Sequence, residues 1–166
     1  MKEKDLKSLP PLTIPYFPLH LAKAKNGEDL EVFDILRKKY VVLTPEEFVR
    51  QNFIGWLIKH KGYPQSLMAN EVEINLNDTR KRCDTLVYGN ECKPLMVIEY
   101  KAPEVEITQS TFDQIVRYNM ELKAKYLVVS NGRNHYCCVV DYKTGSYNFI
   151  PVIPEYRDAI GRPSVN

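Results

Sequence analysis

The clearest periodic pattern in the chain is an apolar stripe at helical spacing, made by Val49, Phe53, Trp56 and Leu57. Helix start signals precede it: Thr44 is a favourable N-cap, Pro45 suits the first helical position, and Glu47 completes a capping box. The run Gly62-Tyr63-Pro64 is typical of a helix end and follows soon after His60. The pattern therefore predicts one long helix with an apolar face.

Further along the chain, several runs carry the alternating or continuous apolar pattern of β-strands. These runs are Glu71–Leu76, Cys83–Tyr88, Leu95–Lys101, Tyr126–Ser130, Tyr136–Tyr142 and Ser146–Ile150. Leu95–Lys101 begins as an almost unbroken apolar run, which is typical of a central strand covered on both faces. A second helix is predicted over Thr111–Lys123, and a crossover through it makes Leu95–Lys101 and Tyr126–Ser130 a parallel pair. The order of elements predicts an α/β fold with a single mixed β-sheet flanked by helices.

Short turn signals separate these runs. Hairpin turns are predicted at Asn77-Asp78, Gly89-Asn90-Glu91 and Lys143-Thr144-Gly145. Asn26-Gly27 predicts another hairpin turn, between the runs His20–Lys25 and Glu28–Phe33, because Asn-Gly is the strongest two-residue hairpin signal.

The N-terminal segment differs from the rest of the chain in its proline content. Residues 1–19 contain four prolines, so we expect an extended arm without a helix. We divide the chain into this Pro-rich arm with the start of a hairpin (1–27), a central domain (28–150) and a C-terminal tail (151–166).

Composition limits the class of protein. The chain has 166 residues, which suits one domain, and 23 Lys and Arg against 21 Asp and Glu give a net charge of +2. This balance excludes a strongly basic coat, so any contact with nucleic acid must come from a local patch. The four cysteines lack zinc-site spacing and are expected to be reduced thiols. No apolar run reaches the ~18 residues of a membrane helix, so we expect a soluble, cytoplasmic protein.

The most informative segment for chemistry runs from Asp84 to Lys101. Residues i and i+2 of a strand point to the same face, so Glu99 and Lys101 project together at the end of a buried strand. If a hairpin pairs this strand with the preceding one, Asp84 and Glu99 can reach one cation. Hard oxygen ligands without His or Cys favour Mg²⁺ or Mn²⁺. Such an ion could stabilise charge on a phosphodiester, with Lys101 positioning the attacking water. Taken alone, the spacing also fits a surface Glu–Lys contact beside an unrelated Asp.

The same segment resembles a known family. Arg82–Val87 followed by Pro94–Pro103 resembles the core of the PD-(D/E)xK nucleases, although Cys83 stands where the family's namesake proline would be. More specifically, the chain resembles the N-terminal nuclease domain of the restriction subunit of type I restriction enzymes. The further segments that carry this resemblance are Thr44–Gln51, Gly62–Pro64, Gln114–Tyr118 and Asn131-Gly132. The resemblance implies a restriction-endonuclease-like core in residues 28–150.

The resemblance also implies roles for individual residues. Asp84 and Glu99 match the metal-binding acids, and Lys101 matches the catalytic lysine. Gln114 and Tyr118, one helical turn apart, match a Q-x-x-x-Y pair that lies beside the active site and contacts DNA or orients the catalytic groups.

The first predicted helix offers two candidates for an additional metal-binding acid. Glu47 already has a structural role in the capping box, whereas Glu46 falls near the centre of the apolar face and needs a partner. We therefore favour Glu46 and keep Glu47 as the alternative. Arg50 and Gln51 either support Glu46 or are simply exposed helix residues.

Three basic residues, Arg80, Lys81 and Arg82, lie beside Asp84 in sequence. They could contact a DNA backbone, or they could form a solvated turn. The chain lacks the G-x-x-x-x-G-K-[ST] loop of a helicase motor. Either it works with separately encoded motor, methylation or specificity subunits as partners besides DNA, or it is a freestanding relative of the family with another role.

The leading interpretation is a metal-dependent DNA endonuclease domain of the restriction-modification type without its own motor. Two alternatives remain open. The domain could be a non-catalytic DNA-binding or subunit-assembly module that keeps the nuclease fold, or it could act on RNA.

Overall fold

The computed structural model describes residues 1–76 and 79–161. In chain order its elements are α1 (Glu3–Ser8), β1 (Leu21–Lys23), β2 (Leu30–Asp34), β3 (Lys39–Val42), α2 (Pro45–Lys61), η1 (Gln65–Leu67), β4 (Met68–Leu76), β5 (Thr79–Tyr88), η2 (Asn90–Cys92), β6 (Pro94–Tyr100), α3 (Gln109–Leu122), β7 (Tyr126–Ser130), β8 (His135–Asp141), β9 (Ser146–Ile150) and α4 (Tyr156–Ala159). The strands form a six-stranded sheet in the order β4-β5-β6-β7-β8-β9 and a three-stranded sheet in the order β1-β2-β3.

The six-stranded sheet follows the sequence predictions closely. The pair β6–β7 is parallel, with Met96 opposite Tyr126, and the other neighbours are antiparallel. The predicted turns after β5 and β8 are confirmed, and Gly145 has the left-handed φ of +69° that its turn requires. The predicted turn at Asn77-Asp78 lies outside the described residues.

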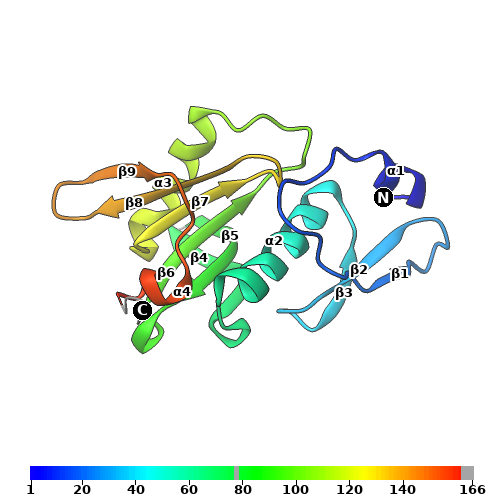
Figure 1. The fold of residues 1–166 in the computed structure, drawn as a ribbon, viewed down its shortest axis with the longest axis horizontal. Coiled ribbons are helices and arrows are strands. Elements are labelled where there is room, and N and C mark those ends of the chain that lie inside the picture. The colour runs from blue at the N-terminus through cyan, green and yellow to red at the C-terminus, as the bar shows by residue number, and fades with distance from the viewer. Residues whose placement is uncertain (77–78, 162–166) are drawn as a thin grey trace.

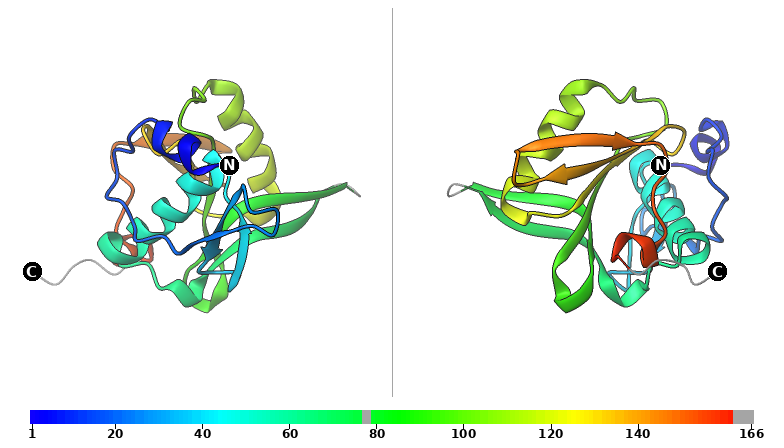
Figure 2. Two further views of the ribbon diagram at one scale, coloured as in Figure 1. Left: turned by 90° about the vertical axis from the view of Figure 1, so that its right-hand side faces the viewer. Right: turned by 60° about the vertical axis from the view of Figure 1, so that its left-hand side comes forward.

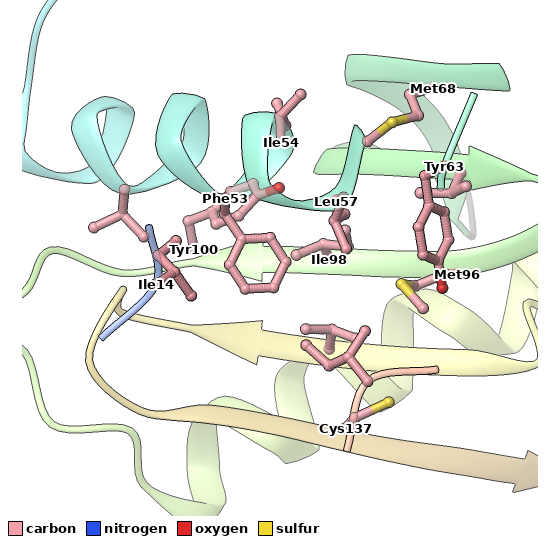
Figure 3. Packing of buried hydrophobic residues seen from close by; sticks show 14 of the residues in the cluster. Ile14, Phe53, Ile54, Leu57, Tyr63, Met68, Met96, Ile98, Tyr100 and Cys137 are labelled. Atoms are coloured by element: carbon pink, nitrogen blue, oxygen red, sulfur yellow. The ribbon is translucent and has the colours of Figure 1, made fainter. Parts of the chain in front are cut away.

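Two hydrophobic cores cover the two faces of the six-stranded sheet. One core joins α2 to the sheet through buried Phe53 and Leu57, which lie on the side of the helix that faces Ile98 and Tyr100 of β6 (Figure 3). The other core joins α3 to the opposite face through residues that include Phe112, Ile115, Val97 and Val129. The two helices therefore lie on opposite sides of the sheet (Figure 2), and β6 is covered on both faces as its apolar run indicates.

The prediction of a single sheet is wrong, because β1, β2 and β3 form a separate antiparallel sheet beside α2 (Figure 1). Leu30 and Val32 of β2 are buried in the same core as α2. β3 carries the sequence Lys-Tyr-Val-Val and is mostly exposed, so its pattern lacks the buried alternation that identifies a strand. The hairpin between β1 and β2 is confirmed, but its loop is longer than two residues. Asn26 Oδ1 accepts hydrogen bonds from the backbone N–H groups of Glu28 and Asp29, each at 3.1 Å.

The prediction of an N-terminal arm without a helix is wrong for its first residues. α1 ends before Pro10, so the prolines do not interfere with it, and a Lys7–Glu3 ion pair of 2.8 Å spans one turn. The segment after α1 packs into the core, with Leu12 and Ile14 buried. The segment after β9 is also anchored, because Ile153 belongs to the same core. In the described part of the chain, no helix has both the length and the apolar character needed to cross a membrane.

Candidate active site

The strands β5 and β6 bring Asp84 and Glu99 together where their backbone pairing ends. The pairing of these strands closes with Thr85 opposite Ile98. Beyond this pair, the backbone N–H of Tyr100 donates a hydrogen bond of 2.8 Å to the side chain of Asp84, at Oδ2, in place of a backbone carbonyl of β5. Lys101 follows directly, and its backbone N–H donates to the Ser130 carbonyl on β7 at 2.9 Å. The candidate site is therefore built on the rigid centre of the sheet.

Glu99 and Lys101 project to the same side, as the i, i+2 spacing predicts. Lys101 Nζ lies 3.5 Å from Glu99 Oε1, and both side chains are partly exposed (25% and 14% of the side chain). The second oxygen, Glu99 Oε2, is buried, and no described residue donates a hydrogen bond to it. A buried carboxylate oxygen without a donor is costly in free energy. This atom is therefore open to a cation or a proton.

Three carboxylates at the site destabilise one another's charged forms. Burial and the charge of Asp84 raise the pKa of Glu99 to about 7, although Lys101 opposes the shift. Burial also raises the pKa of Asp84, against the opposing effects of Arg50 and the Tyr100 N–H. The pKa of Glu46 is raised by burial and by the charge of Asp84. A divalent cation beside these groups would stabilise all three ionised forms.

The donor set fits Mg²⁺ or Mn²⁺ with two protein carboxylates. Among the described residues, no group of three His, Cys, Asp or Glu side chains is arranged to hold a metal ion. Mg²⁺ does not require such a group, because it commonly keeps several waters and binds through one or two carboxylates together with substrate phosphates. Asp84 and Glu99, with an unpartnered oxygen on Glu99, satisfy that requirement, and Glu46 is close enough to interact electrostatically with both.

The two acids at the start of α2 have different surroundings. Thr44 caps the helix as predicted, accepting a hydrogen bond of 3.0 Å from the Glu47 N–H. The Glu47 carboxylate does not complete the capping box. It accepts hydrogen bonds from Arg37 Nη2 at 3.2 Å and from Gln51 Nε2 at 2.8 Å. Glu47 is thus committed to a buried network, whereas Glu46 interacts with Asp84 and Lys101.

Arg50 is a central residue of the site, and the sequence left open whether it supports Glu46 or is an exposed helix residue. It is 3% exposed, so the interpretation as an exposed helix residue is wrong. Its Nη1 donates to Glu71 Oε1 at 2.5 Å and its Nη2 donates to Asp84 Oδ1 at 3.1 Å. Its guanidinium also lies 5.7 Å from the centre of the Tyr100 ring. The sequence feature that indicates a role at the site is the position of Arg50 one helical turn after Glu46, on the same face of the helix.

The remaining candidates from the sequence lie on α3 and on the first part of β5. α3 carries both Gln114 and Tyr118. Gln114 is exposed, and the side chain of Tyr118 lies outside what the structure describes. Arg80 and Arg82 lie on β5 with exposed side chains, and Lys81 between them has no described side chain. The basic residues therefore belong to a strand and not to a turn, although Arg80 and Arg82 are solvent-exposed as the turn interpretation expects.

Comparisons with known proteins agree with this architecture. A family model described as Type I restriction enzyme R protein N terminus (HSDR_N) matches residues 45–154. Among solved structures, one described as a fragment of an HsdR subunit of a type I restriction enzyme from Vibrio vulnificus YJ016 has a TM-score of 0.54 and 20% sequence identity. That match covers 72% of this chain and 25% of the other, so it shows a shared fold over about a quarter of the other chain. No curated protein matches the chain. Since the family model spans more than half of its length, the chain belongs to the family of N-terminal domains of type I restriction enzyme R proteins.

Proposed function

We propose that this chain is a metal-dependent DNA endonuclease domain that hydrolyses phosphodiester bonds within a restriction-modification system. The observation that carries the proposal is the convergence of Asp84, Glu99 and Lys101 where the pairing of β5 with β6 ends, with Glu99 Oε2 buried and without a donor among the described residues. Membership in the R-protein family supports the reaction class.

The chain's own residues would divide the work as follows. Asp84 and Glu99 would hold Mg²⁺ or Mn²⁺, and Glu46 would contribute negative charge, either directly or through a water. When bound, the ion would supply charge stabilisation for the scissile phosphate and lower the pKa of a water. Lys101, held by Glu99 at 3.5 Å, would donate a hydrogen bond to the attacking water or to a phosphate oxygen.

Contacts with DNA would come from outside the group of acids. Gln114 and Tyr118 on α3 would support the site and touch the substrate. The strip Arg80–Arg82 on β5 would approach the phosphate backbone, where Lys and Arg contacts provide affinity without reading sequence. Because the chain has a net charge of only +2, we expect weak binding by this domain alone. Motor, methylation or specificity components of such a system would then provide recognition and translocation.

Metal binding tests the site without requiring any partner. We would titrate Mn²⁺ calorimetrically into the parent chain, Asp84→Asn, and the control Glu91→Gln. Glu91 is an exposed acid that forms an ion pair with exposed Lys93. We expect binding by the parent and the control, and none by Asp84→Asn. Absence of binding by a folded parent chain, or equal binding by Asp84→Asn, would overturn the metal site.

A cleavage assay on DNA with Mg²⁺ then distinguishes an enzyme from a binding module. Lys101→Ala should bind Mn²⁺ but lose cleavage. Cleavage by Lys101→Ala at the parent rate would refute the mechanism, and DNA binding without cleavage by the parent would favour the non-catalytic module. Competition between DNA and RNA substrates addresses the remaining alternative.

A further inference from the structure

The guanidinium of Arg50 connects three acids that come from three different elements. Glu47 belongs to α2 itself, Glu71 to β4 and Asp84 to β5. The contacts are 3.5 Å to Glu47 Oε2, 2.5 Å to Glu71 Oε1 and 3.1 Å to Asp84 Oδ1. Burial alone would lower the pKa of Arg50, but the three acids raise it above its ordinary value, so the charge is permanent. A single buried cation thus ties α2 to β4 and β5 beside the candidate metal site.

The backbone of Glu71 is strained in a way that directs its carboxylate to Arg50. Its φ is +56°, in the left-handed region that a residue with a Cβ seldom adopts. The β4–β5 register pairs Asn70 with Thr85 and Val72 with Cys83, and Glu71 lies between these pairs beside Asp84. Strain of this kind persists only where the surrounding structure imposes it, and it is common at functional sites.

The acids orient the guanidinium through its two terminal nitrogens, and its third nitrogen, Nε, takes no part. Arg50 Nε is buried and has no hydrogen-bond partner among the described residues, whereas both Nη atoms are used on carboxylates. The two terminal nitrogens of one planar fork therefore fix the spacing between Glu71 and Asp84. Lysine could not reproduce this geometry, because an ammonium is a point charge without a rigid fork.

Asp84 is consequently held from two sides. Arg50 Nη2 binds Oδ1, and the Tyr100 backbone N–H binds Oδ2 at 2.8 Å. Two donors on two different oxygens fix the rotation of the carboxylate while leaving lone pairs free on each oxygen. The partners that orient a metal ligand have a large effect on metal affinity, because they place the ligand in advance.

We infer that Arg50, anchored by Glu71 and Glu47, is a positioning residue that fixes the Asp84 carboxylate for a divalent metal ion. The inference rests on the proposed function, because it assumes that Asp84 binds the ion. It differs from the simpler role of a counter-charge for buried acids. A counter-charge would repel the ion and oppose its binding, whereas a positioning residue promotes binding in spite of its charge.

Two variants separate the roles. Arg50→Lys keeps the positive charge and removes the fork, and Arg82→Gln is the matched control. Arg82 also contacts Glu71, at 3.4 Å, but it is exposed and the structure gives it no contact with Asp84. We expect Arg50→Lys to bind Mn²⁺ about 10-fold more weakly than the parent, and Arg82→Gln to bind as the parent does. Unchanged affinity in Arg50→Lys would overturn the inference.

A metal-free measurement keeps this test independent of the proposed function. The amide proton of Tyr100 reports on the Asp84 carboxylate through its hydrogen bond, so its NMR chemical shift can be compared in EDTA. We expect the resonance to move upfield in Arg50→Lys and to stay in place in Arg82→Gln. An unchanged Tyr100 resonance in Arg50→Lys would refute the positioning role, whereas failure of the parent to bind Mn²⁺ would refute the metal site itself.

Arg50 is buried, so the lysine variant could fail to fold, which circular dichroism would reveal. Glu71→Gln then provides the decisive variant, because it weakens the shortest ion-pair contact of Arg50 and leaves both Arg50 and Asp84 intact. We expect the same upfield change at Tyr100 and a weaker affinity for Mn²⁺. Parent values for both would overturn the inference.

Discussion

Replacing Glu99 by glutamine should stabilise the metal-free protein while destroying its metal site. Glu99 is 14% exposed at the side chain, and burial together with the charge of Asp84 raises its pKa from 4.5 to about 7. The difference corresponds to about 3 kcal/mol against the ionised form in the folded state. Because the substitution also leaves Lys101 without its partner, we expect Glu99→Gln to raise the free energy of unfolding by ~1–3 kcal/mol at pH 8.

The sign of the pH dependence follows from the direction of this pKa. The folded state binds the Glu99 proton more tightly than the unfolded state, so ionisation costs the folded protein stability as the pH rises from about 4.5 to about 7. The cost is fully present above pH 7 and absent below about pH 4.5. The advantage of Glu99→Gln over the parent should therefore be greatest at pH 8 and should shrink at pH 5.

Urea unfolding in EDTA at pH 8 and pH 5 measures this effect. Glu91→Gln serves as the control, because Glu91 is an exposed acid and its loss should change stability little at either pH. A destabilised Glu99→Gln at pH 8, or an advantage that does not shrink at pH 5, would refute the reasoning. Added Mn²⁺ should stabilise the parent and leave Glu99→Gln unchanged.

Three further predictions concern the site and the fold. Mn²⁺ affinity of the parent, measured by calorimetry, should fall about 5-fold between pH 7 and pH 6, because Glu99 with a pKa of about 7 must lose its proton to bind the ion; a flat profile would contradict this. Phe53→Ala should lower the free energy of unfolding by about 3–5 kcal/mol, since Phe53 is fully buried against Tyr100 and Trp56; a loss below about 1 kcal/mol in urea would show that the core repacks. Gly132→Ala should cost more than ~1 kcal/mol by thermal unfolding, because φ is +79° and a Cβ would come within 2.6 Å of Leu12 Cδ2; parent stability would mean that the N-terminal segment shifts without penalty.

Local patterns were enough to predict most of the six-stranded sheet and its two main helices. The apolar stripe and the Thr44 cap define α2, and the continuous apolar run of β6 reflects its burial on both faces. The crossover through α3 requires the parallel pairing of β6 and β7. These features depend on neighbours in sequence, so a sequence expresses them directly.

The separate three-stranded sheet and α1 were not predicted, for different reasons. β3 has little buried surface, so no alternating pattern identifies it. α1 precedes the first proline of the arm, and the prolines further along do not affect it. For α1, the proline content of the whole segment was therefore a poor guide to the structure of its first residues.

The sequence by itself determined which groups could do chemistry: two acids and a lysine on neighbouring strands, with the i, i+2 spacing that places Glu99 and Lys101 together. Only the tertiary structure decided how those groups are held. Arg50 meets Glu71, 21 residues away, and Asp84, 34 residues away. Such contacts depend on how α2 packs across the strands and on a left-handed residue in β4. The physical reason is that an ion pair between residues far apart in sequence leaves no local pattern. Burial leaves a periodic pattern, and capping and turn formation leave characteristic residues at neighbouring positions.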